Sequence, residues 1–282
     1  MKHLISAFVF LLITATTLAQ PSTEVYLFDL GKDGRLSNPV NISNNPGYDN
    51  QPSFTRGGSH LLYTSTRGDQ TDIIKYDLES GEKSWMTATE GGEYSPTQIP
   101  GSYEFSSILL EPNGRQLLWK YSLNAGQGEI LIPYLKIGYH TWVDDRLLYA
   151  FVLGPHSTLQ RIDLSTQRAE IVREDIGRSI HYIPEMNVIA FVDKASEPWM
   201  VSLLKLEDHS VSLLAATLEQ SEDMAYSNGY LWMGKDSKLY RMKAETDAKW
   251  EEVYDLNSFG LEGISRLSIH PDGNKIAIVL SE

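Results

Sequence analysis

A repeat of short β-rich runs constrains the fold of this chain more than any other feature of the sequence. In Tyr48–Trp85, four such runs are separated by turns rich in Gly, Asp and Ser, as in consecutive antiparallel hairpins. The first run recurs at steps of 41 to 45 residues. Its anchors are Pro52, Pro96, Thr141, Tyr182, Met224 and Arg266. This period, with four strands per unit, predicts an all-β fold: a six-bladed β-propeller with four-stranded antiparallel blades.

The two ends of the chain each supply half of one unit. Residues 24–43 match the third and fourth strands of the repeat, with no first half before them. Ile264–Glu282 matches the first and second strands, with nothing after them. The sequence therefore predicts a last blade that is closed by strands from both termini. It also predicts that residues 20–282 form a single propeller domain.

The first residues have the pattern of a signal peptide. Lys2 precedes an apolar run from Leu4 to Leu12, and the small residue Ala19 suits a cleavage site before Gln20. A membrane-spanning helix needs about 20 apolar residues, and this run is shorter. We therefore expect residues 1–19 to be a signal peptide. The mature chain is expected to be periplasmic or secreted, with no membrane anchor after cleavage.

The composition excludes several classes of function. The formal net charge is −13 and the chain contains no cysteine. Nucleic acids and anionic membranes bind basic surfaces, so an acidic chain is not expected to bind either of them. The lack of cysteine excludes disulfides, thiolate metal sites and a cysteine nucleophile. We expect a monomer whose partner is a protein, a peptide or a glycan.

Two stretches of the sequence resemble a known repeat. Pro52–Gly58, followed by LLYTST, and Ser268–Gly273, followed by KIAIV, are similar to the TolB-type propeller repeat. Asp72–Leu78 and Thr158–Leu164 resemble the third strand of that repeat. The resemblance implies a six-bladed disc with a central channel, commonly used as a periplasmic protein-binding platform or as the propeller part of larger enzymes. The chain lacks the N-terminal α/β domain of full TolB, so TolB's role in its envelope complex is not expected here.

Polar and ionisable residues cluster just before the anchors, where the inner strands of a propeller line one mouth of its channel. Loops on a rigid scaffold are free to vary and often carry function. The candidate ligand-binding residues at this mouth are Asp49, Glu93, Tyr94, His140, Arg178, His181, Glu222 and Asp223. The same positions also suit a water-filled channel without any function, because clustered titratable groups are only probabilistic markers of a site.

Three kinds of chemistry are open to these residues. Neutral His140 and His181, together with Glu222 or Glu93, could hold a divalent metal. Arg178 with the histidines could clamp an anionic group, such as a uronate or a peptide carboxylate. A histidine and a carboxylate could also act as base and acid in a lyase or hydrolase.

Catalytic signatures are missing from the sequence. It contains no G-x-S-x-G, no H-E-x-x-H and no phosphate-cradling glycine loop. The prediction is therefore an exported, non-catalytic binding or scaffold propeller that uses its polar channel mouth. The alternative is a metal-assisted lyase or hydrolase acting on an anionic sugar or a related small molecule at the same mouth. In that case the cofactor would be a divalent metal, with His140, His181 and Glu222 as candidate ligands.

Overall fold

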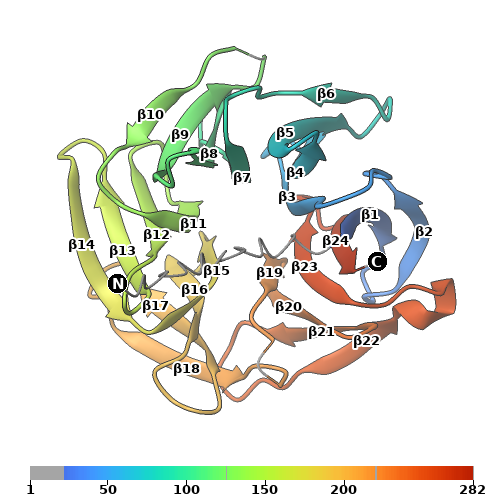
Figure 1. Ribbon diagram of the computed structural model, residues 1–282. Coiled ribbons are helices and arrows are strands. Elements are labelled where there is room, and N and C mark those ends of the chain that lie inside the picture. The colour runs from blue at the N-terminus through green and yellow to red at the C-terminus, as the bar shows by residue number, and fades with distance from the viewer. Residues whose placement is uncertain (1–21, 125, 220, 282) are drawn as a thin grey trace, which may run out of the picture.

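Six four-stranded sheets are arranged in a ring around a central axis (Figure 1). The computed structural model describes residues 22–124, 126–219 and 221–281. Within them the chain forms β-strands β1 to β24 and one 3-10 helix, η1 (Leu256–Phe259). The predicted signal peptide, residues 1–19, lies outside the described residues. Among the described residues, no helix has the length and the apolar character that crossing a membrane requires.

Each blade runs from the axis outward as inner, second, third and outer strand. The inner strands of blades 1 to 6 are β3 (Asn50–Phe54), β7 (Gly92–Gln98), β11 (Ile137–Trp142), β15 (Ile176–Ile183), β19 (Met224–Ser227) and β23 (Ile264–Ile269). The second strands are β4 (His60–Arg67), β8 (Glu104–Leu110), β12 (Leu147–Val152), β16 (Val188–Asp193), β20 (Tyr230–Lys235) and β24 (Lys275–Ser281). All six anchors fall within the inner strands, so the predicted six-bladed fold is confirmed.

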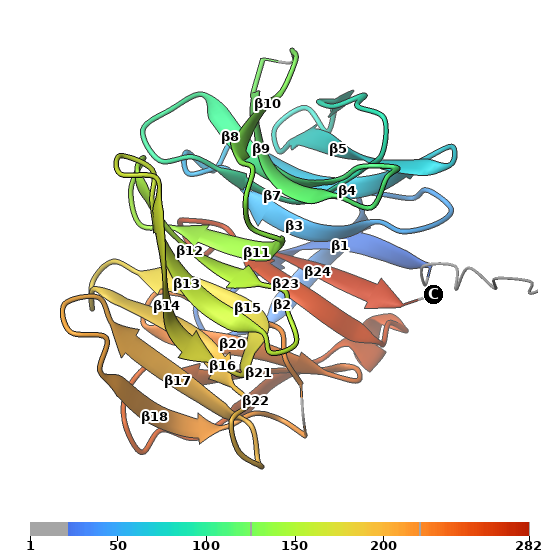
Figure 2. The same cartoon turned by 60° about the vertical axis from the view of Figure 1, so that its left-hand side comes forward.

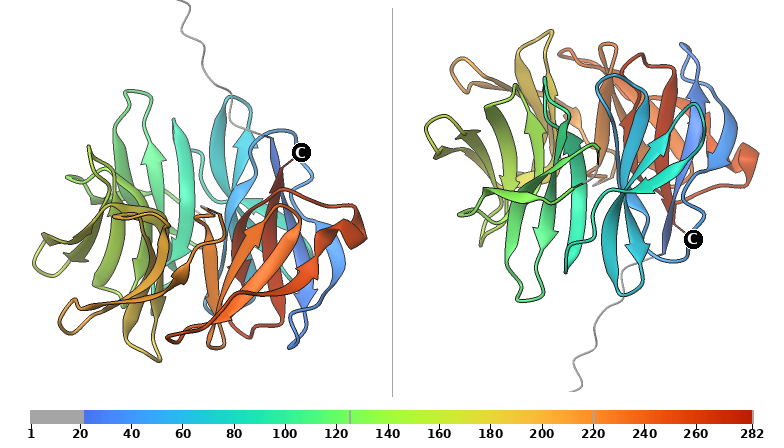
Figure 3. Two further views of the ribbon diagram at one scale, coloured as in Figure 1. Left: turned by 90° about the horizontal axis from the view of Figure 1, so that it is seen from below. Right: turned by 90° about the horizontal axis from the view of Figure 1, so that it is seen from above.

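The outer half of each blade completes the sheet. The third strands are β5 (Gln70–Asp77), β9 (Gln116–Ser122), β13 (Thr158–Asp163), β17 (Met200–Lys205), β21 (Lys238–Lys243) and β1 (Thr23–Leu30). The outer strands are β6 (Lys83–Trp85), β10 (Glu129–Ile132), β14 (Arg168–Glu174), β18 (Val211–Ala216), β22 (Glu251–Asp255) and β2 (Leu36–Asn41). Neighbouring strands within each sheet are antiparallel, and the blades stand side by side as twisted sheets (Figures 2 and 3).

Blade 6 joins the two ends of the chain, as the sequence predicts. Its strand order is β2-β1-β24-β23, so an N-terminal strand pairs with the C-terminal strand. The pairing of β1 with β24 is antiparallel and continuous, with Tyr26 opposite Ile278. The Lys275 ammonium donates to Asp29 Oδ1 at 2.5 Å across the same pair. Backbone hydrogen bonds thus close the ring within a sheet and not between two sheets.

The hydrophobic core is divided among the interfaces between blades. Each of six apolar clusters of described residues joins one blade to the next. On β4, Leu61 and Tyr63 pack toward blade 6, whereas Leu62 packs toward blade 2. Because alternate side chains of a strand point to opposite faces of the sheet, a strand between two neighbours must be apolar on both faces. This explains continuous apolar runs such as Val188–Val192, which are fully or almost fully buried.

The inner strands are irregular where they face the axis. The pairing of inner with second strand shifts register in blades 1, 2, 3, 4 and 6. In blades 1 and 2 the shift coincides with positive φ angles at Gln51 (56°) and Ser95 (54°). A bulge of this kind redirects the side chains that flank it. The irregularity therefore decides which side chains at the start of each inner strand point toward the axis.

Candidate functional site

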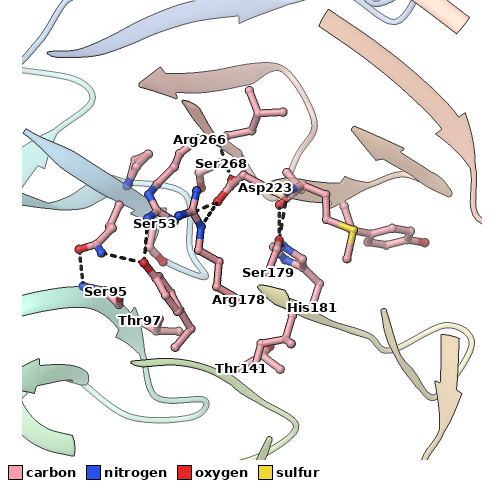
Figure 4. Close-up of a pocket in the computed structure, with 18 of the residues that line it drawn as sticks. Ser53, Ser95, Thr97, Thr141, Arg178, Ser179, His181, Asp223, Arg266 and Ser268 are labelled. Atoms are coloured by element: carbon pink, nitrogen blue, oxygen red, sulfur yellow. Dashed lines mark hydrogen bonds and ion pairs between the residues drawn. The ribbon is translucent and has the colours of Figure 1, made fainter. Parts of the chain in front are cut away.

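The six inner strands enclose a central cavity of about 240 Å³ (Figures 1 and 4). Much of its wall is made of hydroxyl-bearing side chains on the inner strands. These are Ser53, Ser95, Thr97, Thr141, Ser179 and Ser268. The cavity is therefore polar, and it has donors and acceptors on all sides for a polar ligand.

Three charged residues meet at this cavity: Arg178, Asp223 and Arg266. Arg178 is the third residue of β15, Asp223 immediately precedes β19, and Arg266 is the third residue of β23. The inner strands run in the same direction along the axis because the blades share one topology, so these positions lie at the same end of the channel. In Figure 4 both arginine side chains are directed at the Asp223 carboxylate.

Arg266 and Asp223 form a hydrogen-bonded ion pair across the interface between blades 5 and 6. Arg266 Nη1 lies 3.0 Å from Asp223 Oδ2, and the backbone N–H of Leu267 donates to Oδ1 at 3.2 Å. Burial disfavours the charged guanidinium of Arg266. The Asp223 carboxylate and the nearby hydroxyls of Tyr139 and Tyr48 outweigh that effect, so the pKa of Arg266 lies above its ordinary value. The Arg266 guanidinium is therefore charged throughout the physiological pH range.

Tyr139 extends this network from blade 3. Its hydroxyl accepts hydrogen bonds from Arg266 Nη2 at 2.7 Å and from Gln51 Nε2 at 3.5 Å. The Arg266 guanidinium also lies 5.1 Å from the centre of the Tyr139 ring, within the range of a cation–π contact. Tyr48 is close by, and burial raises the pKa of its hydroxyl to about 12. The Tyr48 phenol therefore stays protonated at neutral pH.

Gln51 fixes the geometry of blades 1 and 2 at the cavity. Its Oε1 accepts from the Thr64 hydroxyl at 3.0 Å and from the backbone N–H of Ser95 at 2.9 Å. Both Gln51 and Ser95 have positive φ angles, which few non-glycine residues adopt without cost. The hydrogen bond between the two bulges is thus part of what holds the cavity wall in shape.

The backbone of Arg178 is hydrogen-bonded to Glu222, whereas its side chain has fewer partners than that of Arg266. Its N–H donates to Glu222 Oε1 at 2.5 Å. Its Nε lies 4.0 Å from Asp223 Oδ2, beyond hydrogen-bonding distance. This buried Nε has no hydrogen-bond partner within the described part of the chain. The second arginine of the cavity therefore has an unsatisfied donor.

His140 lines the cavity but belongs to a buried network between blades 2 and 3. Its Nε2 lies 2.6 Å from the Ser106 hydroxyl, which also accepts from Trp142 Nε1 at 2.9 Å and donates to the carbonyl of Thr97 at 3.1 Å. Because that hydroxyl already donates its one proton, His140 Nε2 must be the protonated nitrogen. Burial lowers the pKa of His140 to about 3. The ring is therefore a neutral hydrogen-bond donor.

His181 has a similar arrangement on blade 4. Its Nε2 lies 3.1 Å from the Ser179 hydroxyl, which also bonds the backbone of Met224 on blade 5. Burial lowers the pKa of His181, and the Asp223 carboxylate only partly opposes that effect. Both histidines of the cavity are therefore neutral at physiological pH.

Four of the predicted mouth residues do not line the cavity. Asp49 lies buried between blades 6 and 1, where Asn45 Nδ2 is 3.3 Å from its Oδ2 and burial raises its pKa to about 6. Glu93 lies buried between blades 1 and 2, where Tyr121 donates to it at 3.3 Å and burial raises its pKa to about 8. Tyr94 stacks edge-on against Tyr48, with ring centroids 6.3 Å apart.

Glu222, the fourth of them, is occupied by structural partners. Besides the Arg178 backbone, it binds the Lys194 ammonium at 3.1 Å. Within the described residues, no group of three His, Asp or Glu side chains could hold a metal ion. The predicted set of His140, His181 and Glu222 is therefore not brought together, because each residue bonds a different partner.

Sequence reasoning places Tyr139 just before an anchor, at the mouth, but it does not single out Arg266 or Gln51 as cavity residues. Arg266 is the one charged residue of the strand Ile264–Ile269. A charge at such a position must face a partner or the channel. That signal was available. The position of Gln51 depends on the bulge in its inner strand, which the repeat does not reveal.

Comparison with known proteins places the fold. No protein-family model and no curated protein matches this sequence. The solved structure of a putative TolB from Agrobacterium tumefaciens superposes with a TM-score of 0.72 at 13% identity, over 93% of this chain and 99% of that chain. XC5397 from Xanthomonas campestris, a gluconolactonase, gives a TM-score of 0.66 at 9% identity, over 96% of this chain and 99% of that chain.

An oligogalacturonate lyase in complex with manganese is also similar, with a TM-score of 0.57 at 14% identity, over 91% of this chain and 78% of that chain. At such identities the likeness concerns the fold alone, and the shared scaffold includes both TolB and enzymes. Six four-stranded blades, with the ring closed by strands from both termini, give this chain the fold of the TolB-type six-bladed β-propellers.

Proposed function

We propose that this chain is an exported, non-catalytic binding propeller that holds a peptide, a glycan or a protein partner at its central cavity. The observation that carries the proposal is the state of the cavity's ionisable groups. Asp223 is bound to Arg266, and the two histidines are neutral donors to serine hydroxyls. A general base needs a pKa near the working pH, whereas the pKa of His140 is lowered to about 3. These groups suit recognition better than proton transfer.

The metal-assisted lyase or hydrolase has less support. It requires His140, His181 and a carboxylate to converge on one ion at distances of about 2.0–2.2 Å. Glu222 is instead bound to Lys194, and His140 Nε2 faces Ser106. The likeness to an oligogalacturonate lyase and to a gluconolactonase concerns the scaffold. We therefore advance no second function.

Blocking the cavity tests the proposal. Ser268 points into the cavity (Figure 4) and its side chain makes no hydrogen bond within the described residues, so Ser268→Trp should fill the space at little cost to the fold. Ser212, exposed on the outer strand β18, supplies the matched control Ser212→Trp. Peptide and glycan arrays are probed with the wild type and both variants.

Ligands that bind the wild type and Ser212→Trp, but not Ser268→Trp, would support the proposal. Ligands that bind all three proteins equally would move the binding site away from the cavity. Chemical turnover of a bound ligand by the wild type would overturn the non-catalytic assignment.

Export is the remaining part of the proposal, and it is tested separately. Expression with and without residues 1–19, followed by fractionation and N-terminal sequencing, should find the full-length product outside the cytoplasm with a new N-terminus near Gln20. Retention of both forms in the cytoplasm would overturn this part.

A further inference from the structure

The central cavity carries a net positive charge, although the chain as a whole has a formal net charge of −13. Two guanidinium groups, Arg178 and Arg266, face one carboxylate, Asp223, and both lining histidines are neutral. We propose that this cavity is a site for one carboxylate group of the ligand, with Arg178 as its cationic partner. The inference rests on the proposed binding function and names the chemical group that is bound.

Arg266 is not available as that partner. Its Nη1 is bound to Asp223 at 3.0 Å and its Nη2 to the Tyr139 hydroxyl at 2.7 Å. Only 11% of its side chain is exposed. The other carboxylate oxygen of Asp223 accepts a hydrogen bond from the Leu267 N–H. The Arg266–Asp223 pair is thus already hydrogen-bonded, and Arg178 has no counter-ion within hydrogen-bonding distance at the cavity among the described residues.

Arg178 has both a free donor and access to the cavity. Its Nε is buried and unpartnered within the described chain, and the nearest carboxylate oxygen is 4.0 Å away. Over a third of its side chain (36%) remains exposed. A buried N–H without an acceptor is costly, and a charged donor more so. A carboxylate in the cavity would instead bind the exposed end of the Arg178 guanidinium through charge-assisted hydrogen bonds.

Tyr139 supplies a second donor, next to the ion pair of Arg266 and Asp223. Its hydroxyl accepts from Arg266 and from Gln51, so its own O–H proton is left to donate elsewhere. The hydroxyls of Ser53, Ser268 and their neighbours add weaker donors around the cavity. A carboxylate has two acceptor oxygens, which matches one charged donor and one phenol.

The charge balance favours a single negative charge over a dianion such as phosphate. One net positive charge is neutralised by one carboxylate, and Asp223 would repel any further negative charge. A cavity of about 240 Å³ takes the acid group of a ligand and not a whole oligomer. The carboxylate could therefore be the free C-terminus of a peptide or the acid group of a sugar, with the rest of the ligand outside the mouth.

The experiment measures the binding of four pairs of probes to the purified protein by calorimetry and NMR. They are acetate against acetamide, acetyl-dialanine against its amide, a hexuronic acid against its neutral hexose, and acetate against phosphate. Each is measured with the wild type, Arg178→Gln and the control Arg168→Gln, whose arginine is exposed on the outer strand β14. A fourth protein, Asp223→Asn, removes the repelling charge and keeps an acceptor for the Leu267 N–H.

We expect the acid of each pair to bind more tightly than its neutral partner. The affinity should fall about tenfold or more in Arg178→Gln, be unchanged in Arg168→Gln and rise in Asp223→Asn. Binding should also weaken with added salt. The peptide and sugar probes show which source of carboxylate is preferred.

Phosphate binding tighter than acetate, or equal affinity in Arg178→Gln and the wild type, would overturn the inference. Neutral ligands that bind in the cavity and are blocked by Ser268→Trp would overturn the inference and leave the proposed function standing. If every ligand found binds Ser268→Trp as well as the wild type, both fail.

Discussion

Arg266 Nη1 lies 3.0 Å from Asp223 Oδ2, and this contact joins blade 6 to the segment that leads into blade 5. Both side chains are largely buried, with exposed fractions of 11% and 14%. The pair therefore has two roles at once. It fixes the position of two neighbouring inner strands, and it sets the charge of the cavity wall.

Removal of Asp223 should destabilise the protein strongly. Asp223→Ala leaves the Arg266 guanidinium buried without its counter-ion, which typically costs about 3–5 kcal/mol. Urea denaturation followed by tryptophan fluorescence measures the loss. In Asp223→Leu combined with Arg266→Met both charges are absent, so much of the stability should return. A double variant less stable than Asp223→Ala would show that the ion pair itself, and not the unpaired charge, governs stability.

The seam between β1 and β24 should be as sensitive as the rest of the core. Ile278 is fully buried opposite Tyr26, so Ile278→Ala should lower the free energy of unfolding by about 2–5 kcal/mol. Val40, half exposed on the outer strand of the same blade, is the control, and Val40→Ala should change stability by less than about 0.5 kcal/mol. Similar small losses for both would mean that the seam is not a cooperative part of the fold.

Stability should fall as the pH rises through the range in which Glu93 ionises. Burial raises the pKa of Glu93 from 4.5 to about 8 in the folded protein, so the folded state holds this proton more tightly than the unfolded state does. The stabilisation is complete below about pH 4.5 and is lost as the pH approaches 8.

Glu93→Gln tests this dependence because an amide does not ionise. Between pH 5 and 8, the variant should gain stability relative to the wild type by an amount on the order of 1–3 kcal/mol. Taking the difference between the two proteins cancels the contributions of Asp49 and His140. Glu90→Gln, at an exposed position, should leave the pH profile unchanged. A Glu93→Gln profile parallel to that of the wild type would contradict the shift.

A glycine contact between blades 1 and 6 gives a further test. Gly58 has φ +70°, and its carbonyl lies 2.8 Å from His270 Nε2. A methyl group at Gly58 would lie 2.3 Å from that nitrogen, whereas Gly68, with φ +64°, has nothing within 4 Å. Both alanine variants carry the backbone strain. Gly58→Ala should therefore lose about 1–3 kcal/mol more than Gly68→Ala in thermal unfolding. Equal losses would mean that His270 moves aside freely.

Metal content should not depend on the two cavity histidines. Elemental analysis of the dialysed wild type and of His140→Ala/His181→Ala should give the same result, because the two rings bond different serines and share no carboxylate. Near-stoichiometric metal in the wild type that disappears in the double variant would support the alternative function, a metal-assisted lyase or hydrolase. Circular dichroism of the double variant checks that it folds.

The repeat was enough to predict the blades, their strand order and the split last blade. Each of these depends on the spacing of apolar runs and turns, which is local information. The cavity was harder to predict because it depends on side-chain direction at the bulged starts of the inner strands. Arg178, His181 and Asp223 do reach it, but Asp49 and Glu93, also placed at the mouth, are buried between blades. Gln51 and Ser95, with their positive φ angles, turn the chain at this point.

Pairing between the first and the last strand also sets an order of events during synthesis. Of the described strands, β1 and β2 are made before all the others, and β24, the partner of β1, is made after them. Until then one edge of β1 has unpaired backbone groups, and an open edge of this kind can pair with other chains. The ring can close only after translation has passed β24. The topology therefore lets the disc close only when all six blades have been made.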